Sequence, residues 1–279
     1  MCTSGQDQYK WCASLSYRAE KGRGRMNRQP QGPHKASASV PYKALPACTF
    51  AFQPIVNTRS RAVVAYEALV RGPKGESAST IINDIANEDL PRFDGLCRSS
   101  AMQLASRLSI DCDLNLNLLP QGFHADRDCL ASTLDAAIKY NFFPERLVVE
   151  VTEGEVLGNQ ERFTDLMEVY RGLGMRLAID DFGSGYSGLN LLADFQPDQI
   201  KLDKNLARGI PGRRPRQAIV RAILQVCRDL GIEMIAEGIE TADEYHWFSD
   251  QGVELFQGYL FGRPGFELLP PVHVPEYSY

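Results

Sequence analysis

The chain has 279 residues, of which 44% are hydrophobic and 23% are charged, and its formal net charge at pH 7 is −5. This composition is typical of an ordinary globular protein. No stretch approaches the ~20 apolar residues that a membrane-spanning helix needs, and the first residues lack the apolar core of a secretory signal, so we expect a cytoplasmic protein without a membrane span.

The beginning of the chain differs in charge from the rest. The first 46 residues carry a net charge of +6, so the remainder carries −11. A basic leader can contact nucleic acid or an anionic membrane, but this one is polar and lacks interleaved aromatic residues, which favours a solvated tail. We therefore predict a disordered leader at 1–47, a folded domain at 48–268 and a C-terminal tail at 269–279. The acidic domain disfavours nucleic acid as a partner.

Regular structure is predicted to begin near residue 48. Residues 48–56 and 62–70 are apolar runs of strand length, and the short turn between them allows the two strands to pair as a hairpin. A loop follows, then a weakly helical stretch at 79–88 and an amphipathic helix at 94–109 with an apolar side.

From residue 113 onward, strands and helices alternate. Strands are predicted at 113–118, 146–152, 176–181, 199–203, 233–238 and 255–261, and helices at 124–140, 159–173, 187–194, 214–230 and 241–250. Such alternation indicates right-handed βαβ units and a parallel sheet. Eight strands in roughly 220 residues fit a TIM-like (β/α)₈ barrel, whose functional site lies at the carboxyl ends of the strands. A doubly wound open sheet is the alternative.

The predicted strands share one feature, which is a polar residue where the apolar run ends. These residues are Glu67, Asn117, Glu150, Asp180, Asp181, Lys201, Glu237 and Gln257. Carboxylates gathered at one edge of a sheet repel one another and cost desolvation energy unless a cation lies among them. A salt bridge, a helix cap or a solvated loop explains any one of the acids but not the set. Because only oxygen ligands converge, Mg²⁺ or Mn²⁺ is favoured over zinc.

Other motifs are weaker. The segment GSGYSG at 183–188, with Asp203 downstream, matches a dinucleotide-binding fingerprint. It follows two aspartates that would repel a pyrophosphate and precedes only a short helix, so a flexible glycine loop beside the site is the better interpretation. His124 and His246 lie away from the strand ends and are interpreted as surface or boundary residues. No nucleophile turn of the Gly-x-Ser-x-Gly type is present.

The seven cysteines are scattered, with no Cys-x-x-Cys pair. An odd, unpatterned set favours reduced thiols over a disulfide framework or a zinc site. We expect Cys97, Cys112 and Cys227 to be small, buried apolar side chains.

A series of segments in a fixed order carries a family resemblance. They are FQPIV at 52–56, YEALVRG around Glu67-Ala68-Leu69, NLNLLP at 115–120, VEVTE at 149–153, DDFGSGYSGL at 180–189, IKLDK at 200–204, AEGIET at 236–241 and QGYLFGRP at 257–264. From residue 48 to about residue 266, the chain resembles the EAL-domain phosphodiesterases of bacterial cyclic di-GMP signalling. The resemblance implies a TIM-like barrel with one antiparallel early strand, and metal-dependent hydrolysis of cyclic di-GMP to linear 5′-pGpG.

The resemblance also implies a role for individual residues. One Mg²⁺ or Mn²⁺ would be held by Glu67, Asn117, Glu150 and Asp180, and a second by Asp180, Asp181 and Glu237. Substrate contacts would come from Gln53, Leu69, Arg71 and Asp203. Catalysis would depend on Lys201, Glu237, Gln257 and Glu67, with Lys201 and Gln257 positioning the attacking water. Support for these groups would come from Glu153, Ser184, Asp203 and Glu240.

Lys201 lies among carboxylates in this arrangement, so its pKa should be raised rather than lowered. We therefore expect Lys201 to orient the water and stabilise negative charge rather than act as a free base. The two ions would activate the water and neutralise charge on the phosphoryl oxygens.

The chain departs from the family pattern in two places. Ser184 stands where the family more often has Thr, and Gly188 where it more often has Ser, which loosens the loop. The stretch between Arg71 and Asn117 is short, as in EAL domains that follow blue-light-sensing flavin domains, although residues 1–47 are too few to form such a sensor.

Three functions remain open at this stage. We favour an active phosphodiesterase, working as a homodimer as many members do, because every metal ligand and Lys201 are present. A catalytically silent receptor that binds cyclic di-GMP or a partner protein is the alternative. An unrelated metal-dependent barrel hydrolase or lyase requires the motif series to be a coincidence.

Overall fold

A computed structural model describes residues 44–118, 127–158, 160–185 and 188–275. The predicted leader, except for residues 44–47, lies outside these residues, as does His124. The described part begins at the boundary that separates Met1–Lys43 from the compact unit of Ala44–Tyr279.

Eight strands of the described unit close into a ring. They are β1 (Thr49–Asn57), β2 (Ala62–Arg71), β3 (Asp113–Asn117), β4 (Leu147–Thr152), β5 (Arg176–Phe182), β6 (Gln199–Leu202), β7 (Glu233–Ala236) and β8 (Leu255–Phe256). The order runs from β2 to β8 and then to β1, and β1 pairs back with β2. The TIM-like barrel prediction is confirmed, and the doubly wound open sheet is wrong because the ring has no free ends.

One strand of the ring runs against the others. β1 pairs antiparallel with β2 and with β8, whereas every pairing from β2 through β8 is parallel. The hairpin predicted at 48–70 therefore supplies the antiparallel early strand. A short strand, β9 (Gly265–Phe266), pairs with β1 at Ala51 and Phe52.

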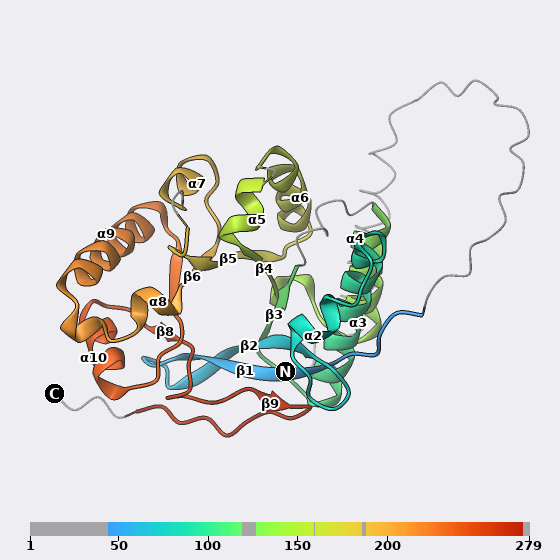
Figure 1. The fold of residues 1–279 in the computed structure, drawn as a ribbon, viewed down its shortest axis with the longest axis horizontal. Coiled ribbons are helices and arrows are strands. Elements are labelled where there is room, and N and C mark those ends of the chain that lie inside the picture. The colour runs from blue at the N-terminus through green and yellow to red at the C-terminus, as the bar shows by residue number, and fades with distance from the viewer. Residues whose placement is uncertain (1–43, 119–126, 159, 186–187, 276–279) are drawn as a thin grey trace, which may run out of the picture. The chain divides into compact units, whose positions relative to one another are not determined.

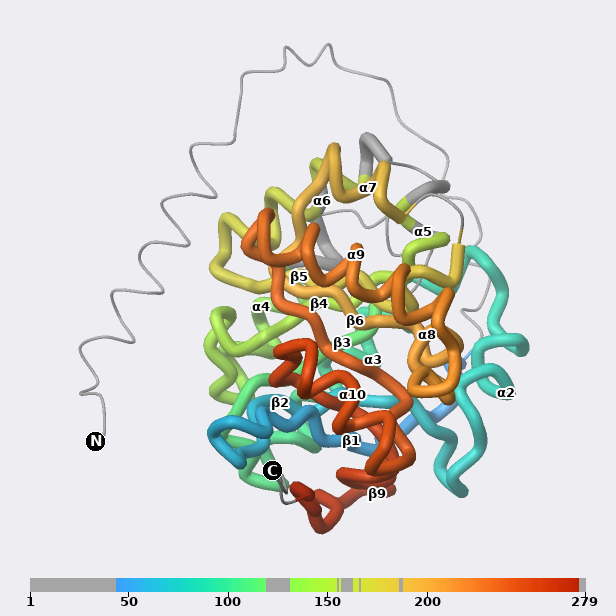
Figure 2. Tube along the Cα trace, turned by 90° about the vertical axis from the view of Figure 1, so that its left-hand side faces the viewer, coloured from blue at the N-terminus to red at the C-terminus, as the bar shows by residue number. Residues whose placement is uncertain are grey.

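Helices lie around the outside of the ring (Figures 1 and 2). They are α2 (Ala78–Ile82), α3 (Leu90–Arg107), α4 (Arg127–Lys139), α5 (Glu153–Gly158), α6 (Gln160–Gly172), α7 (Gly188–Asp194), α8 (Lys204–Ala207), α9 (Arg214–Leu230) and α10 (Ala242–Asp250). Short 3₁₀ turns occur at Asn87–Asp89, Pro144–Arg146 and Ile210–Gly212. None of the helices in the described ranges is long and apolar enough to cross a membrane.

Local sequence explains the ends of these helices. α9 buries Val220, Ile223, Leu224 and Cys227 on one face and ends at Gly231, whose φ of +70° suits glycine and whose N–H bonds back to the last turn. α10 begins with a capping box, in which the Thr241 side chain accepts from the Glu244 N–H and Glu244 accepts from the Thr241 N–H. The predicted end of the helix at 214–230 is confirmed, and the helix predicted to begin at residue 241 begins at residue 242.

The strands are covered on both faces, which explains their continuous apolar runs. In β4, the five residues from Leu147 to Val151 are all buried, although one of them is Glu150. A carboxylate buried in the middle of such a run points into the ring at its carboxyl end rather than into the layer between sheet and helices.

Some predicted elements differ from the structure. The final strand was predicted over 255–261 but ends at Phe256. After it the backbone turns toward Ile239, and a Cβ at Gly258 would lie 2.1 Å from the Ile239 carbonyl oxygen, so the chain cannot continue along the sheet there. The helix predicted at 79–88 divides into α2 and a separate 3₁₀ turn, and α5 and α8 were not predicted.

Candidate active site

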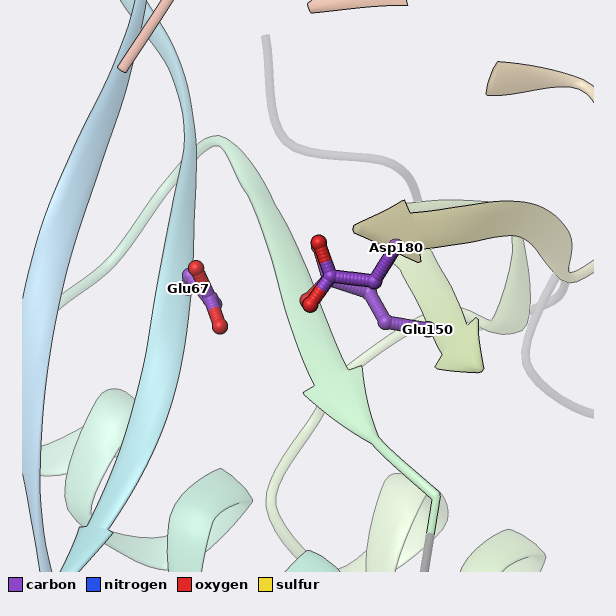
Figure 3. A group of neighbouring side chains, drawn as sticks. All are labelled: Glu67, Glu150 and Asp180. Carbon is purple, nitrogen blue, oxygen red and sulfur yellow. The ribbon is translucent and has the colours of Figure 1, made fainter. Parts of the chain in front are cut away.

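The polar residues that end the strands come together at one end of the ring. Glu67 extends from β2, Glu150 from β4 and Asp180 from β5, and their carboxylates face one another across the ring (Figure 3). The register brings this about, because Asn117 is level with Glu150 and Thr152 with Asp180 on neighbouring parallel strands. The predicted convergence of strand ends is therefore present in the fold.

Lys201 lies at the centre of this cluster and is 1% exposed. Its Nζ is 3.1 Å from Glu67 Oε2, 3.0 Å from Glu150 Oε2, 3.2 Å from Asp180 Oδ1 and 2.8 Å from Glu237 Oε1. An ammonium group has three protons, so it cannot bond to all four carboxylates at once. Four carboxylates around a single ammonium carry a surplus of negative charge that the described side chains do not neutralise.

The ionisation of Lys201 follows from these contacts. Burial alone would lower the pKa of Lys201, but the charges of Asp180, Glu150, Glu237 and Glu67 together raise it well above its ordinary value. The expectation of a raised pKa is confirmed. These carboxylates favour the charged form of Lys201, which suits it to orienting a ligand and stabilising negative charge rather than to accepting a proton.

Glu67 is buried and accepts three hydrogen bonds. The donors are Asn117 Nδ2 at 2.9 Å, Gln257 Nε2 at 2.7 Å and Lys201 Nζ at 3.1 Å. Burial raises the pKa of Glu67, but the charge of Lys201 and these bonds outweigh it, so the net shift of the pKa is downward. Glu67 is therefore held as a carboxylate, with its orientation fixed by donors from β3, from β6 and from the residue that follows β8.

The carboxyl group of Glu150 is fully buried, and its pKa is shifted upward, in contrast to that of Glu67. Burial, followed by the charge of Glu67, raises the pKa of Glu150 well above its ordinary value despite Lys201. Asn115 Nδ2 donates to Glu150 Oε1 at 2.7 Å. Asn115 was not predicted to belong to the site, although it lies two residues before Asn117 in β3 and so shares its face, which is the signal that could have identified it.

The second acidic group contains Asp180, Asp181 and Glu237. Burial is the main cause that raises the pKa of Asp181, with the charge of Asp180 next, and burial raises the pKa of Glu237 to about 8. The backbone at Asp181 has a φ of +51°, where L residues are uncommon, and the β5–β6 register shifts between Ile179 and Phe182. This irregularity lets two consecutive aspartates belong to one site.

The donor set fits divalent cations. One oxygen from each of Glu67, Glu150 and Asp180 lies within 4.8 Å of the others, and the same holds for Asp180, Asp181 and Glu237. Asp180 belongs to both groups, so its carboxylate could bridge two ions. Asn117 places its amide beside the first group, where its nitrogen donates to Glu67, and its amide oxygen would be the ligand if the amide turned over. Hard oxygen ligands without His or Cys suit Mg²⁺, Mn²⁺ or Ca²⁺, and such ions would compensate the surplus charge around Lys201.

Two cavities adjoin the carboxylates, and both are lined by Glu67 and Asp180. The first, of about 310 Å³, is lined also by Leu69, Arg71 and Asn117. The second, of about 340 Å³, is lined also by the side chains of Gln53, Lys201, Glu237, Gln257 and Glu240. Because they share Glu67 and Asp180 in their lining, both cavities adjoin the acidic cluster, and the two together are called the cleft below.

Part of the wall of the first cavity was not predicted. Asp94 and Arg98, one turn apart on α3, form a fully buried ion pair, and Arg98 Nε also donates to Thr133 Oγ1 at 2.9 Å. Both line the cavity beside Arg71. Their spacing in FDGLCR is the i, i+4 spacing of a helical ion pair, which is a signal that the sequence does contain.

The glycine loop is attached to the barrel through Glu153. This side chain is 1% exposed, and its Oε2 accepts from the Gly183 N–H at 2.9 Å and from the Gly185 N–H at 3.4 Å. Ser184 is exposed, and its N–H bonds to the Asp181 carbonyl at 3.1 Å. The loop therefore begins at the second acidic group and is connected by one carboxylate to the first residue of α5, directly after β4.

Asp203 and Glu240, which were predicted to support the site, form their hydrogen bonds and ion pairs with residues outside the acidic cluster. Asp203 is buried and caps α8 by accepting from the Asn205 N–H at 3.0 Å. Glu240 is exposed and forms a two-pronged ion pair with Arg208, one contact of which is 2.6 Å. The ion pair lies at the rim of the second cavity. His246 belongs to α10 and is half-buried, away from the strand ends as predicted.

A closed α/β barrel with acidic groups that could hold cations at the carboxyl ends of its parallel strands defines the class of this protein. Comparison with known proteins gives the family. The family described as "EAL domain" matches residues 45–264, and the chain belongs to that family. The matched range begins within one residue of the described unit.

Sequence relatives differ in what their names say. The blue light- and temperature-regulated antirepressor BluF of Escherichia coli is 33% identical over 81% of this chain and 57% of its own length. The probable cyclic di-GMP phosphodiesterase PdeN of the same species is 30% identical over 77% of this chain and 43% of its own. The chain thus spans about half the length of these curated relatives.

Solved structures agree with the fold. The calcium and cyclic di-GMP complex of BlrP1 from Klebsiella pneumoniae matches with a TM-score of 0.78 at 41% identity, covering 81% of this chain and 57% of that one. A standalone EAL protein from Vibrio cholerae, in its cyclic di-GMP-bound form, also matches with a TM-score of 0.78, at 43% identity, covering 83% and 98%. A manganese and cyclic di-GMP complex of BlrP1 matches at 42% identity.

Proposed function

We propose that this protein is a cyclic di-GMP phosphodiesterase that hydrolyses its substrate to linear 5′-pGpG with two bound Mg²⁺ or Mn²⁺ ions. The observation that carries the proposal is the pair of carboxylate groups that share Asp180 and surround Lys201 between two cavities. Relatives named as probable cyclic di-GMP phosphodiesterases support it, as do the cyclic di-GMP complexes of structural neighbours.

The cleft suits a cyclic dinucleotide. With the scissile phosphodiester at Glu67 and Asp180, which line both cavities, one nucleoside would extend into each cavity. Arg71 is the cation that we assign to a substrate phosphate, and its Nη1 is held at 2.7 Å by the Val70 carbonyl. Leu69 and Gln53 would contact the substrate on opposite sides of the acidic cluster.

The ions, when bound, would supply a water of lowered pKa and would neutralise charge on the phosphoryl oxygens. Lys201 and Gln257 are the chain's own groups for orienting that water, because the Lys201 Nζ and Gln257 Nε2 both bond to Glu67 Oε2. The water oxygen bonds to phosphorus, the bond from phosphorus to the 3′ oxygen breaks, and a proton passes to that oxygen. Two-metal hydrolysis of this kind leaves the 5′-phosphate of the linear product.

The first test is hydrolysis of cyclic di-GMP by the purified protein with Mg²⁺, with Mn²⁺ and with a chelator, followed by chromatography of the products. We expect linear dinucleotide only when a metal is present. Linear diguanylate and an aryl phosphodiester, offered in parallel, distinguish this activity from that of an unrelated hydrolase. The proposal fails if no metal yields product although the folded protein still binds cyclic di-GMP.

Glu67→Ala should abolish turnover, because it removes a ligand and the acceptor of three hydrogen bonds. Glu168→Ala, at an exposed position of α6, is the matched control and should leave turnover unchanged. Wild-type turnover by the Glu67 variant would refute the assignment of the metal site.

A receptor without catalysis is the second candidate, and the name of the relative BluF, an antirepressor, favours it. It predicts binding of cyclic di-GMP, or of a partner protein, with no product under any metal condition. We also propose that the protein works in the cytoplasm as a homodimer, which sedimentation at several concentrations will test.

A further inference from the structure

Two cysteines far apart in the sequence meet beside the first cavity. Cys48 immediately precedes β1, and Cys97 belongs to α3, 49 residues later. Their Sγ atoms are 3.8 Å apart, within range of an S–H···S hydrogen bond, and both side chains are half-buried. The expectation that Cys97 is simply a buried apolar residue is therefore incomplete, whereas Cys227 is buried as expected.

We propose that Cys48 and Cys97 form a reversible disulfide when the protein meets a peroxide, so that the pair is an oxidation site adjoining the cleft. The Cys48 thiolate attacks one peroxide oxygen, the O–O bond breaks, and hydroxide leaves, which gives a sulfenic acid at Cys48. The Cys97 sulfur then attacks the Cys48 sulfur, and the S–O bond breaks. The proton of the Cys97 thiol leaves with the hydroxyl group as water. One peroxide molecule has then oxidised two thiols to one disulfide.

The positions of the two residues permit this bond. A disulfide needs a sulfur separation of about 2.0 Å, so the two sulfur atoms, now 3.8 Å apart, must approach each other by about half of that distance. Residues 44–48 have no regular structure, so Cys48 can shift without breaking a strand or helix. Cys97 lies inside the 18-residue helix α3, which would act as the fixed partner.

The two thiols differ in reactivity, which assigns the order of the steps. When Cys97 donates the hydrogen bond, this bond lowers the pKa of Cys48. Burial raises the pKa of Cys48, but by less. The same bond, followed by burial, raises the pKa of Cys97. The thiolate is the reactive form of cysteine, so Cys48 is the attacking residue and Cys97 the resolving one.

A small oxidant can reach Cys48. This residue lines a cavity of about 290 Å³, together with Arg107 and Glu267. Cys97 lines the first cavity of the cleft instead. The two cysteines therefore connect a cavity that could admit an oxidant with the cavity that is lined by Arg71.

Oxidation would alter the cleft through α3. Cys97 lies between Asp94 and Arg98, the buried ion pair in the wall of the first cavity. Because α3 stays in place, a bond to Cys48 would instead turn the Cys97 side chain, which lines the first cavity, and so change the shape of that wall. This consequence depends on the proposed function, because the cavity matters to catalysis only if it receives substrate.

The test of the bond itself needs no catalysis. The full-length protein, with metal, is treated with hydrogen peroxide, its remaining thiols are blocked, and it is digested without reductant for mass spectrometry. We expect a cross-linked pair of peptides containing Cys48 and Cys97 that lacks two hydrogen atoms, and that separates when a thiol reductant is added.

Variants make the assignment specific. Cys97→Ser should give no cross-link and leave Cys48 as a sulfenic acid, whereas Cys112→Ser, a half-buried cysteine outside the pair, should cross-link like the wild type. If the wild-type protein keeps both thiols free, or if Cys48 pairs equally with other cysteines, the proposal is overturned. Peptide mapping of the wild type decides this even if a variant does not fold.

A second measurement addresses the effect on the cleft. The affinity for cyclic di-GMP, measured by calorimetry with a chelator present, is compared before and after oxidation. Coupling between adjoining sites is worth about fivefold or more in affinity, and we expect such a change in the wild type but not in Cys97→Ser. A cross-link without any change in affinity would refute the effect on the cleft but not the oxidation site. A protein that never binds cyclic di-GMP would instead refute the proposed function.

Discussion

Replacement of Lys201 by methionine tests the electrostatic balance of the acidic cluster. Methionine keeps most of the buried chain length but removes the one ammonium group that, among the described residues, lies within 3.2 Å of the four carboxylates. Removing one partner from a buried ion pair typically costs about 3–5 kcal/mol. In a unit of this size each kcal/mol lowers the melting temperature by about 2–4 °C, so the metal-free variant should melt about 6–20 °C below the wild type.

The loss should depend on pH and on metal. At acidic pH the carboxylates of the variant can take up protons, so the difference between Lys201→Met and the wild type should shrink between pH 8 and pH 5.5. Divalent ions replace the missing positive charge, so Mn²⁺ should raise the melting temperature of the variant more than that of the wild type. Lys74→Met, at an exposed lysine, is the matched control and should melt like the wild type.

A turnover assay distinguishes the stabilising charge of Lys201 from its proposed role in orienting the attacking water. The metal-loaded variant should be folded yet turn over cyclic di-GMP about 10²–10³-fold more slowly, which is the cost of losing one preorganised donor in an active site. Scanning calorimetry with chelator and with Mn²⁺, followed by the chromatographic assay, measures both quantities. A metal-free variant that melts with the wild type at both pH values would refute the electrostatic reasoning, and full turnover would refute the role in orienting water.

Three further outcomes can be measured. Gly188→Ser should be about 1 kcal/mol more stable than Gly188→Ala, because a Cβ there lies 3.2 Å from the buried Glu153 Oε1, which accepts no hydrogen bond from the described residues; equal urea midpoints would contradict this. Burial raises the pKa of Glu237 to about 8, so its stabilising contribution in metal-free protein is complete below the unfolded pKa of about 4.3 and is lost as pH rises through about 8. Urea unfolding with chelator should therefore show stability falling from pH 5.5 to 9, and a constant or rising stability would exclude this effect. Oxidation of Cys48 and Cys97 closes a loop of 49 residues, which stabilises by up to about 4 kcal/mol, so peroxide should raise the melting temperature of the wild type but not of Cys97→Ser, and a lowered wild-type value would show that the bond strains the fold.

Much of the fold could be predicted because two periodic signals agree along most of the chain. Buried strands such as β4 are continuous apolar runs, and helices such as α9 combine an apolar face with a glycine stop. The signals fail where structure is short or set by distant contacts. The chain after Phe256 is apolar enough for a strand, but it turns because it bonds to the Ile239 backbone, and nothing in the local sequence indicates that partner.

The functional site likewise contains residues that the sequence could predict and contacts that it could not. The carboxylates at the strand ends could be predicted because a parallel barrel brings all its carboxyl ends to one edge, whatever the lengths of the connections. Asn115 and the Asp94–Arg98 pair had local signals, namely the two-residue period of a strand and the i, i+4 spacing of a helix. The contact between Cys48 and Cys97 had none, because it joins two elements 49 residues apart and depends on how α3 packs against β1.

The cluster around Lys201 also shows why stability alone does not explain this site. Glu150, Asp181 and Glu237 all have raised pKa values, mainly because of burial, which means that the fold holds them in a state that they do not favour as anions. A core selected for stability would replace such groups by apolar side chains of similar size, often without loss. A cation bound between them recovers the cost, since each positive charge favours the ionised form of every carboxylate nearby. We therefore expect a bound metal to stabilise the acidic end of the barrel in its ionised form, so that metal binding and folding are coupled.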